Sequence, residues 1–158
     1  MNPFLELHDF CIANRISIAT AESCTAGRIA SEISAISGAS LFFNGGLIAY
    51  QNNIKVKLLG VSELLIKEKT EVSLEVVEQM AEGVRDRFLA DFAISTSGYA
   101  GPSGGTILNP VGTVLIGISS NNKTISKRFL FKGDRESIIN QCVVTACRFL
   151  LKELKKQK

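Results

Sequence analysis

Residues 15–38, RISIATAESCTAGRIASEISAISG, contain the pattern that decides the fold. The first six residues are a short run rich in isoleucine, which predicts a strand over 15–20. An apolar spacing of three and four residues then predicts a helix from Thr25 to a closing Gly38. A strand that leads through a tight turn into a helix is the building unit of α/β proteins.

The same alternation continues on both sides of this stretch. We expect further helices over residues 2–14, 54–60, 62–69 and 73–88 and from Asp134 onward, and further strands over 45–50, 91–97, 113–119 and 123–131. The first strands read as parallel, and the last two, joined by an Asn-Asn turn, as an antiparallel hairpin. A chain of 158 residues is long enough for one domain. The sequence therefore predicts a single α/β domain over 1–158, with three layers and a mixed sheet flanked by helices.

The charge balance argues against a nucleic-acid-binding surface. The formal net charge is +3, and residues 152–158, KELKKQK, hold four lysines and one glutamate that account for all of it. We interpret this tail as a solvated helix end and expect no specific nucleic acid as partner. There is no apolar run of membrane-spanning length and no signal-peptide pattern at the amino terminus. We therefore expect a cytoplasmic protein without a membrane partner.

The cysteines and the histidine exclude several kinds of site. Cys11, Cys24, Cys142 and Cys147 form no CxxC pair and no metal-ligand spacing, so we expect free thiols and no metal. His8, the single histidine, falls within the predicted first helix. A Ser-His-Asp triad therefore cannot be built at any of the loops described next.

Three segments that combine small residues with reactive ones each follow a predicted strand. They are TAESCTAG at 20–27, YQNNIK at 50–55 and SGYAGPSGG at 97–105. In open α/β sheets, ligands bind beyond the carboxyl ends of the strands, so we expect these segments to meet at one edge. The glycines of the third segment permit close backbone approach or an anion-binding nest, although a plain connecting loop is the alternative.

Ser23 in the first segment is the candidate oxygen nucleophile, and Cys24 is its chemical rival. The amide groups of the following helix terminus are candidates for binding a phosphate or an oxyanion. The alternative is that Ser23 or Thr25 simply caps the helix, which is what these residue types do most often.

Lys55 in the second segment is the candidate base. Neutralising a lysine of ordinary pKa costs about 4.6 kcal/mol at neutral pH, so burial or a neighbouring cation must lower its pKa. Lys57 is expected to face solvent. Tyr50 either relays a proton, orients the lysine, or merely ends a strand as an ordinary aromatic. We exclude Glu22 from the catalytic set, because a carboxylate beside Lys55 would stabilise the charged amine.

Together these stretches resemble the CinA carboxy-terminal domain family. The resemblance rests on TAESCTAG, GASLFFNGGLIAYQNNIKVKLLGV at 38–61, SGYAGPSGG, PVGTV at 110–114 and GDRE at 133–136. Enzymatic members of the family are nicotinamide-nucleotide amidohydrolases, also called NMN deamidases. The resemblance implies hydrolysis of the carboxamide of nicotinamide mononucleotide to nicotinate mononucleotide and ammonia, without metal or redox cofactor, in a homodimer.

The family's chemistry, transferred to this chain, makes Ser23 the nucleophile and Lys55 its general base, with Tyr50 assisting. It also implies that the amides near Cys24 and Thr25 are donors to an oxyanion or a phosphate. The full set of implied substrate contacts is Cys24, Thr25, Gly27, Gly46, Gly98, Ala100, Gly101 and Gly105.

Three positions depart from the family pattern. Ala26 replaces a usual glycine, Tyr99 an aliphatic residue, and Asn109 a lysine that commonly precedes the proline. The last two fall in the loop assigned to the substrate. They motivate the alternative of a catalytically weak or inactive homologue that binds a nucleotide or a protein partner. A weaker third alternative is a DNA-associated competence or damage factor.

Overall fold

The strands follow one another along the chain in the predicted succession. The computed structural model describes residues 2–156, in which the five strands form one sheet of order β2-β1-β3-β4-β5. β1 (Ile18–Glu22) runs parallel to β2 (Phe43–Ile48) and to β3 (Phe92–Gly98). β4 (Thr113–Ser120) and β5 (Thr124–Leu130) continue the sheet as an antiparallel hairpin. The predicted mixed sheet is confirmed.

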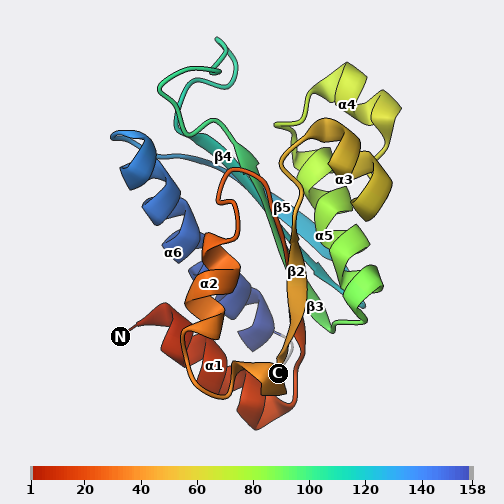
Figure 1. Cartoon of the computed structure of the whole chain (residues 1–158), viewed down its shortest axis with the longest axis vertical. Coiled ribbons are helices and arrows are strands. Elements are labelled where there is room, and N and C mark those ends of the chain that lie inside the picture. Colours follow the sequence, from red (N-terminus) through yellow and green to blue (C-terminus); the bar gives the residue numbers. More distant parts are fainter. Residues whose placement is uncertain (1, 157–158) are drawn as a thin grey trace.

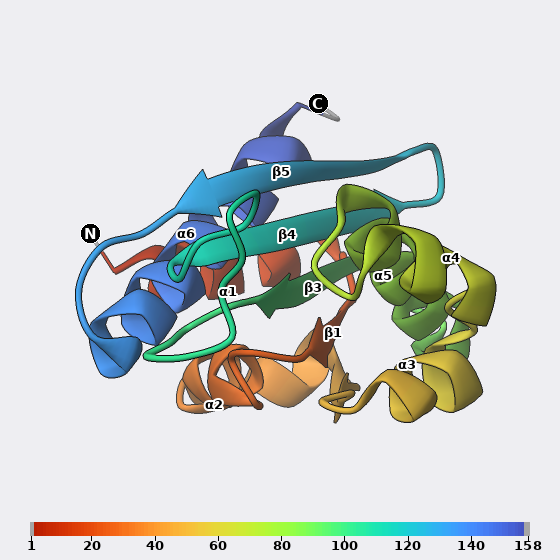
Figure 2. The ribbon, with the colours of Figure 1, turned by 90° about the horizontal axis from the view of Figure 1, so that it is seen from above.

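Helices cover both faces of this sheet, which gives three layers (Figures 1 and 2). One face holds α1 (Pro3–Asn14), α2 (Arg28–Ser34) and α6 (Arg135–Lys155), and a single 3₁₀ turn, Ala39–Leu41, leads into β2. The other face holds α3 (Asn52–Leu59), α4 (Glu63–Lys69) and α5 (Leu74–Phe88). The predicted α/β architecture is therefore also confirmed.

The two faces have separate hydrophobic cores. Ile94 and Ile116 point into the α1–α2–α6 side, whereas Ala93 and Leu115 point into the α3–α4–α5 side. Successive strand residues alternate between faces, so a strand covered on both sides is apolar at nearly every position. This explains why β4 is buried along its whole length.

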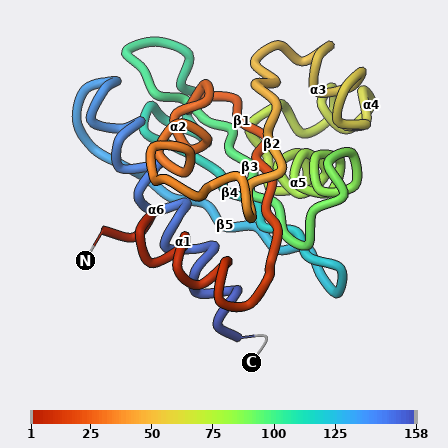
Figure 3. Tube along the Cα trace, turned by 60° about the horizontal axis from the view of Figure 1, so that its bottom comes forward, coloured from red at the N-terminus to blue at the C-terminus, as the bar shows by residue number. Residues whose placement is uncertain are grey.

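The first and last helices of the described chain, α1 and α6, pack side by side (Figure 3). Lys155 of α6 forms an ion pair with Glu6 of α1, and Lys156 forms one with Glu153. Two lysines of the basic tail thus have carboxylate partners. Lys158 lies outside the described residues.

Several predicted boundaries are wrong by two to three residues, and the first matters for the site. β1 begins at Ile18 and extends to Glu22, because Arg15 takes the left-handed conformation that ends α1. Ala21 and Glu22 carry no strong strand signal, but pairing with β2 and β3 on both sides holds them extended. α2 begins at Arg28 rather than at Thr25. The first reactive segment therefore has its first three residues in β1 and its last five in the turn before α2.

All four cysteines are free and buried. Within residues 2–156, no three His, Cys, Asp or Glu side chains come together as metal ligands. In the same range, no helix is both long enough and apolar enough to cross a membrane.

Candidate functional site

The amino terminus of α2 is occupied by a buried carboxylate from the preceding strand. Glu22 Oε2 accepts hydrogen bonds from Thr25 Oγ1 at 2.6 Å, Gly27 N at 3.0 Å and Ile29 N at 3.1 Å. Glu22 Oε1 accepts one from Ala30 N at 2.9 Å. These donors are therefore not available to a ligand, and the expectation that this helix terminus binds an anion is corrected.

The alternative that Ser23 or Thr25 caps α2 is also wrong. Gly27 occupies the N-cap position without a side-chain cap, and the Thr25 hydroxyl donates to Glu22 instead. Ser23 leaves the strand just before this turn, and its amide donates to the Thr96 carbonyl at 3.1 Å. Its hydroxyl is thus free of any capping role.

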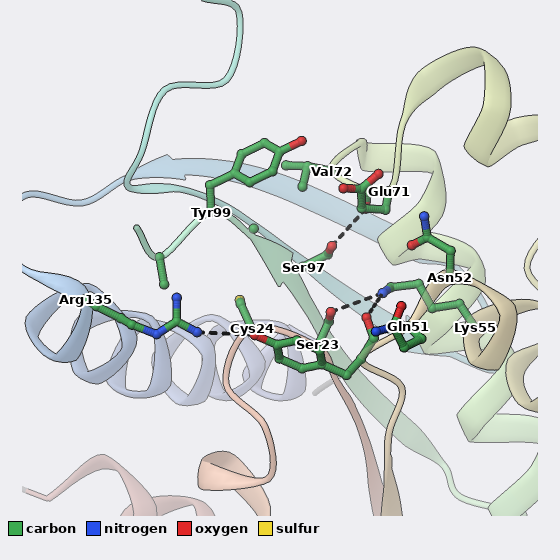
Figure 4. A pocket seen from close by; sticks show the side chains of 13 residues that line it. Ser23, Cys24, Gln51, Asn52, Lys55, Glu71, Val72, Ser97, Tyr99 and Arg135 are labelled. Carbon is green, nitrogen blue, oxygen red and sulfur yellow. Dashed lines mark hydrogen bonds between the residues drawn. The ribbon is translucent and has the colours of Figure 1, made fainter. Parts of the chain in front are cut away.

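The Ser23 hydroxyl faces the amine of Lys55, which is carried by the first turn of α3. Lys55 is 1% exposed, and its Nζ lies 3.1 Å from Ser23 Oγ and 2.9 Å from the carbonyl oxygen of Tyr50 (Figure 4). Burial lowers the pKa of Lys55, while the negative charge of Glu71 and the Cys24 thiol oppose that shift. An amine with a lowered pKa beside a hydroxyl is the arrangement that a serine nucleophile with a lysine base requires.

The pair opens into a pocket of about 260 Å³ at the carboxyl ends of β1, β2 and β3 (Figure 4). Six residues singled out from the sequence line it: Ser23, Cys24, Tyr50, Lys55, Gly98 and Ala100. Seven further lining residues were not named as catalytic or substrate-binding residues, although Tyr99 was placed in the loop assigned to the substrate: Gln51, Asn52, Glu71, Val72, Ser97, Tyr99 and Arg135.

Five of the predicted substrate contacts do not line this pocket. Thr25 and Gly27 serve the Glu22 cap, as described above. A Cβ at Gly46 would lie 2.0 Å from Thr20 Oγ1, so this glycine lets β2 approach β1. Gly101 and Gly105 pack against Val111. These glycines share the motifs of the site but are needed for backbone packing.

Tyr50 contacts the site through two different groups. Its backbone carbonyl accepts the hydrogen bond from Lys55, whereas its phenol oxygen accepts one from Arg135 Nη2 at 3.2 Å. The Tyr50 carbonyl, and not its phenol, therefore orients the lysine amine.

Arg135 brings a cationic group to the pocket from the first turn of α6. Its Nη1 donates to the Gly101 carbonyl at 2.7 Å, which fixes the guanidinium beside the glycine-rich loop. Asp134 caps this helix through the Ser137 amide. The GDRE motif at 133–136 was the only sequence signal for Arg135. Arg135 and Lys55 are 80 residues apart in the chain, so the sequence did not indicate that both line one pocket.

Cys24 lies in the pocket wall as a buried thiol. A hydrogen bond with the buried Cys142 thiol lowers the pKa of Cys24 and raises that of Cys142. Within residues 2–156, the Cys24 amide donates to no carbonyl or side-chain oxygen. This amide remains a candidate oxyanion donor next to Ser23.

The two departures in the glycine-rich loop contact one segment of the opposite wall. Asn109 Nδ2 donates to the Val72 carbonyl at 3.4 Å, and the Tyr99 phenol is hydrogen-bonded to the Thr70 side chain. Ser97 Oγ donates to the carbonyl of Glu71 at 2.8 Å. The linker between α4 and α5 is thereby held against the pocket.

Comparison with known proteins assigns the family. The model of the CinA C-terminal domain matches residues 5–154. This chain belongs to the CinA C-terminal domain family. It is 40% identical over 150 residues to a CinA-like protein of Shewanella pealeana and 43% identical over 143 residues to one of Endomicrobium trichonymphae. These matches cover 94% and 90% of this chain but 35% and 33% of the relatives, so the chain spans about a third of their length.

Solved CinA structures match over the whole domain. The competence damage-inducible protein A of Klebsiella pneumoniae superposes with a TM-score of 0.95 at 31% identity, covering 99% of this chain and 97% of that one. A CinA superfamily protein of Enterobacter cloacae gives a TM-score of 0.92 at 33% identity, covering 96% and 90%. The fold that carries Ser23 and Lys55 is thus the CinA domain fold.

Proposed function

We propose that this CinA domain is an amidohydrolase that converts nicotinamide mononucleotide and water to nicotinate mononucleotide and ammonia. The observation that carries the proposal is the 3.1 Å separation of Ser23 Oγ and Lys55 Nζ, in a pocket where burial lowers the pKa of the lysine. A hydroxyl beside an uncharged amine supplies a nucleophile and a base without histidine. Membership of the CinA family and the pyridine nucleotide activity of its enzymatic members support the choice of substrate.

In the first half-reaction, Ser23 Oγ attacks the carboxamide carbon and Lys55 Nζ takes the hydroxyl proton. The carbonyl oxygen becomes an oxyanion. The Cys24 amide follows the nucleophile directly in the chain and donates to no oxygen among the described residues, so it is the candidate donor for this oxyanion. Collapse of the tetrahedral intermediate breaks the C–N bond. Lys55 returns its proton to the leaving nitrogen, so ammonia departs and a nicotinoyl ester remains on Ser23.

In the second half-reaction, water replaces ammonia in the same geometry. Lys55 Nζ accepts a proton from the water, whose oxygen attacks the ester carbon, and the proton passes to Ser23 Oγ as the ester bond breaks. The products are the free enzyme and the carboxylic acid, which loses its remaining proton to solvent and becomes the carboxylate. The Tyr50 carbonyl, 2.9 Å from Lys55 Nζ, holds the amine in place through both halves.

Ammonia release from nicotinamide mononucleotide by the purified chain tests this proposal. We expect steady turnover that the Ser23→Ala variant lowers by at least about 10³-fold, the scale on which removal of a nucleophile acts. Ser31→Ala, an exposed serine on α2, is the matched control and should keep full activity. Cys24→Ala should lose less than Ser23→Ala does, because the thiol is only the rival nucleophile.

No ammonia above the Ser23→Ala level refutes the proposal. Binding of the nucleotide with thermal stabilisation but no product would favour the alternative, a homologue that binds without turnover.

A further inference from the structure

The pocket contains a carboxylate that the proposed mechanism does not use. Glu71 lines the pocket from the linker between α4 and α5 (Figure 4). Among the described residues, its carboxylate forms no hydrogen bond and no ion pair, although its charge acts on Lys55 and on Tyr99. No buried side-chain oxygen among the described residues lacks a partner, so the Glu71 oxygens are open to the pocket rather than enclosed by protein. A carboxylate in this position is available to a ligand that carries a positive charge.

The position of this carboxylate is fixed by the chain around it. Ser97 Oγ holds the Glu71 carbonyl at 2.8 Å, and Asn109 Nδ2 holds the next carbonyl, that of Val72, at 3.4 Å. The Tyr99 phenol is hydrogen-bonded to Thr70 on the other side. The two residues that depart from the family pattern, Tyr99 and Asn109, thus both support the segment that carries Glu71.

An aromatic ring and a carboxylate on one wall are the usual elements of a cation site. The face of a tyrosine ring attracts a positive charge, and a neighbouring carboxylate strengthens the attraction in a partly desolvated pocket. Arg135 and Lys55 lie on other walls of the same pocket. Arg135 carries a positive charge, and Lys55 acts in the proposed mechanism as an uncharged amine. Without Glu71, a cationic ligand would therefore meet the like charge of Arg135 with no carboxylate on the facing wall.

We propose that Glu71 and Tyr99 form a cation subsite that makes the pocket selective for aromatic amides with a fixed positive charge on the ring. The inference rests on the proposed function for the position of the amide at Ser23. It adds that the charge of an N-substituted pyridinium ring, rather than ring shape alone, is recognised. Uncharged aromatic amides of the same shape are bound more weakly.

Binding of two small probes tests the subsite without relying on catalysis. The probes are 1-methylnicotinamide, with a fixed positive charge, and nicotinamide, which is neutral at pH 8. Both are titrated by calorimetry or NMR against chain carrying Ser23→Ala, so that neither amide is consumed. We expect the cation to bind about tenfold more tightly, the ratio that 1.4 kcal/mol provides.

Further substitutions in the Ser23→Ala chain distinguish a local effect of Glu71 and Tyr99 from the overall electrostatic potential of the protein. Glu71→Gln keeps the shape and should bring the affinity ratio to within about twofold of one, if a single local charge provides it. Glu68→Gln removes an exposed carboxylate on the neighbouring α4 and should leave the ratio unchanged. Tyr99→Leu should lower the ratio, whereas Tyr99→Phe, which keeps the ring, should retain it.

Equal affinity for the two probes in the parent chain overturns the inference, as does undetectable binding of 1-methylnicotinamide. An equal loss in Glu68→Gln and Glu71→Gln also overturns it, because a diffuse field would then explain the preference. Failure of the proposed function is read separately from ammonia release by the wild-type chain. Ammonia release by a chain that binds both probes equally would support the proposed function and refute the cation subsite. Tighter binding of 1-methylnicotinamide by a chain that releases no ammonia would support the subsite and refute the proposed function.

Discussion

Glu22 and Lys55 are two buried ionisable side chains with opposite surroundings. Glu22 precedes Ser23 in the chain, and the Lys55 amine contacts the Ser23 hydroxyl. Glu22 and Lys55 are both 1% exposed. The Glu22 carboxylate accepts hydrogen bonds from one hydroxyl and three amides at the start of α2. Lys55 has two neutral oxygen partners and, within residues 2–156, no ion pair. A buried ionisable group with a full set of hydrogen-bond partners stabilises the fold. A buried ionisable group without a partner of opposite charge has a shifted pKa and is available for proton transfer.

The Lys55→Met variant should give the largest effect and should separate activity from stability. Ammonia release should fall by about 10³-fold or more, because Ser23 loses its base. The free energy of unfolding should stay level or rise by about 1 kcal/mol, since methionine fills similar space without a desolvated amine. Denaturant unfolding and the ammonia assay measure the two quantities. A fall of more than about 2 kcal/mol in the free energy of unfolding would mean that the Lys55 amine stabilises the fold. That result would contradict the contrast drawn between Glu22 and Lys55.

The Glu22→Gln variant should show the reverse pattern. An amide nitrogen would face the donors that now surround the carboxylate, so we expect a loss of about 2–4 kcal/mol in the free energy of unfolding. Activity per folded molecule should change far less than in Lys55→Met. Glu136→Gln is the control, because its carboxylate pairs with Arg28 at the surface, and it should cost under about 1 kcal/mol. Equal losses in the two variants would contradict a structural role specific to Glu22.

Much of the fold could be predicted because its signals are local. Alternating strand and helix periodicities marked the elements, and the predicted mixed sheet was confirmed. The start of β1 was misplaced because Arg15 to Ser17 look like strand residues in isolation. In the structure, Arg15 ends α1 in a left-handed conformation and Ser17 is tied to Asp91, 74 residues away. Only the tertiary context reveals either constraint.

The site was predicted where chemistry and motif coincide and missed where they do not. Ser23 and Lys55 stand in segments that follow strands, and the structure brings them together at 3.1 Å. Glu71 lies in a linker with no motif, and Arg135 reaches the pocket from the last helix. Their placement depends on packing between elements far apart in sequence. Glu22 was left out of the predicted catalytic set, but its helix-capping role was not foreseen, because the strand was expected to end before it.

The pH dependence of turnover reports the protonation state of Lys55. Lys55 acts as a base only when unprotonated, so kcat should rise with pH through a limb whose pKa is below that of an ordinary lysine. Because the Glu71 charge raises the pKa of Lys55, Glu71→Gln should move this limb to lower pH. Rate profiles from pH 6 to pH 10 measure both, over roughly the range in which a lowered lysine pKa is visible. A limb that moves to higher pH in Glu71→Gln would contradict the assigned sign.

The Tyr50→Phe variant should give the smallest effect. The backbone carbonyl that orients Lys55 remains, and the variant loses only the contact between the phenol and Arg135. We expect kcat to fall by less than about threefold, the scale of one exposed hydrogen bond. A loss approaching that of Lys55→Met would show that the phenol itself transfers a proton, and the comparison would have to include Tyr50 as a catalytic group.

Lys55 carries an amine of lowered pKa beside the Ser23 hydroxyl. Titration of the lysine ¹³Cε signals by NMR, with Lys55 assigned by its disappearance in Lys55→Met, measures this pKa directly. We expect Lys55 to lose its proton at lower pH than every other lysine that gives a signal, and we expect Glu22→Gln to leave that order unchanged. A Lys55 signal that titrates together with the surface lysines, or above them, would contradict it.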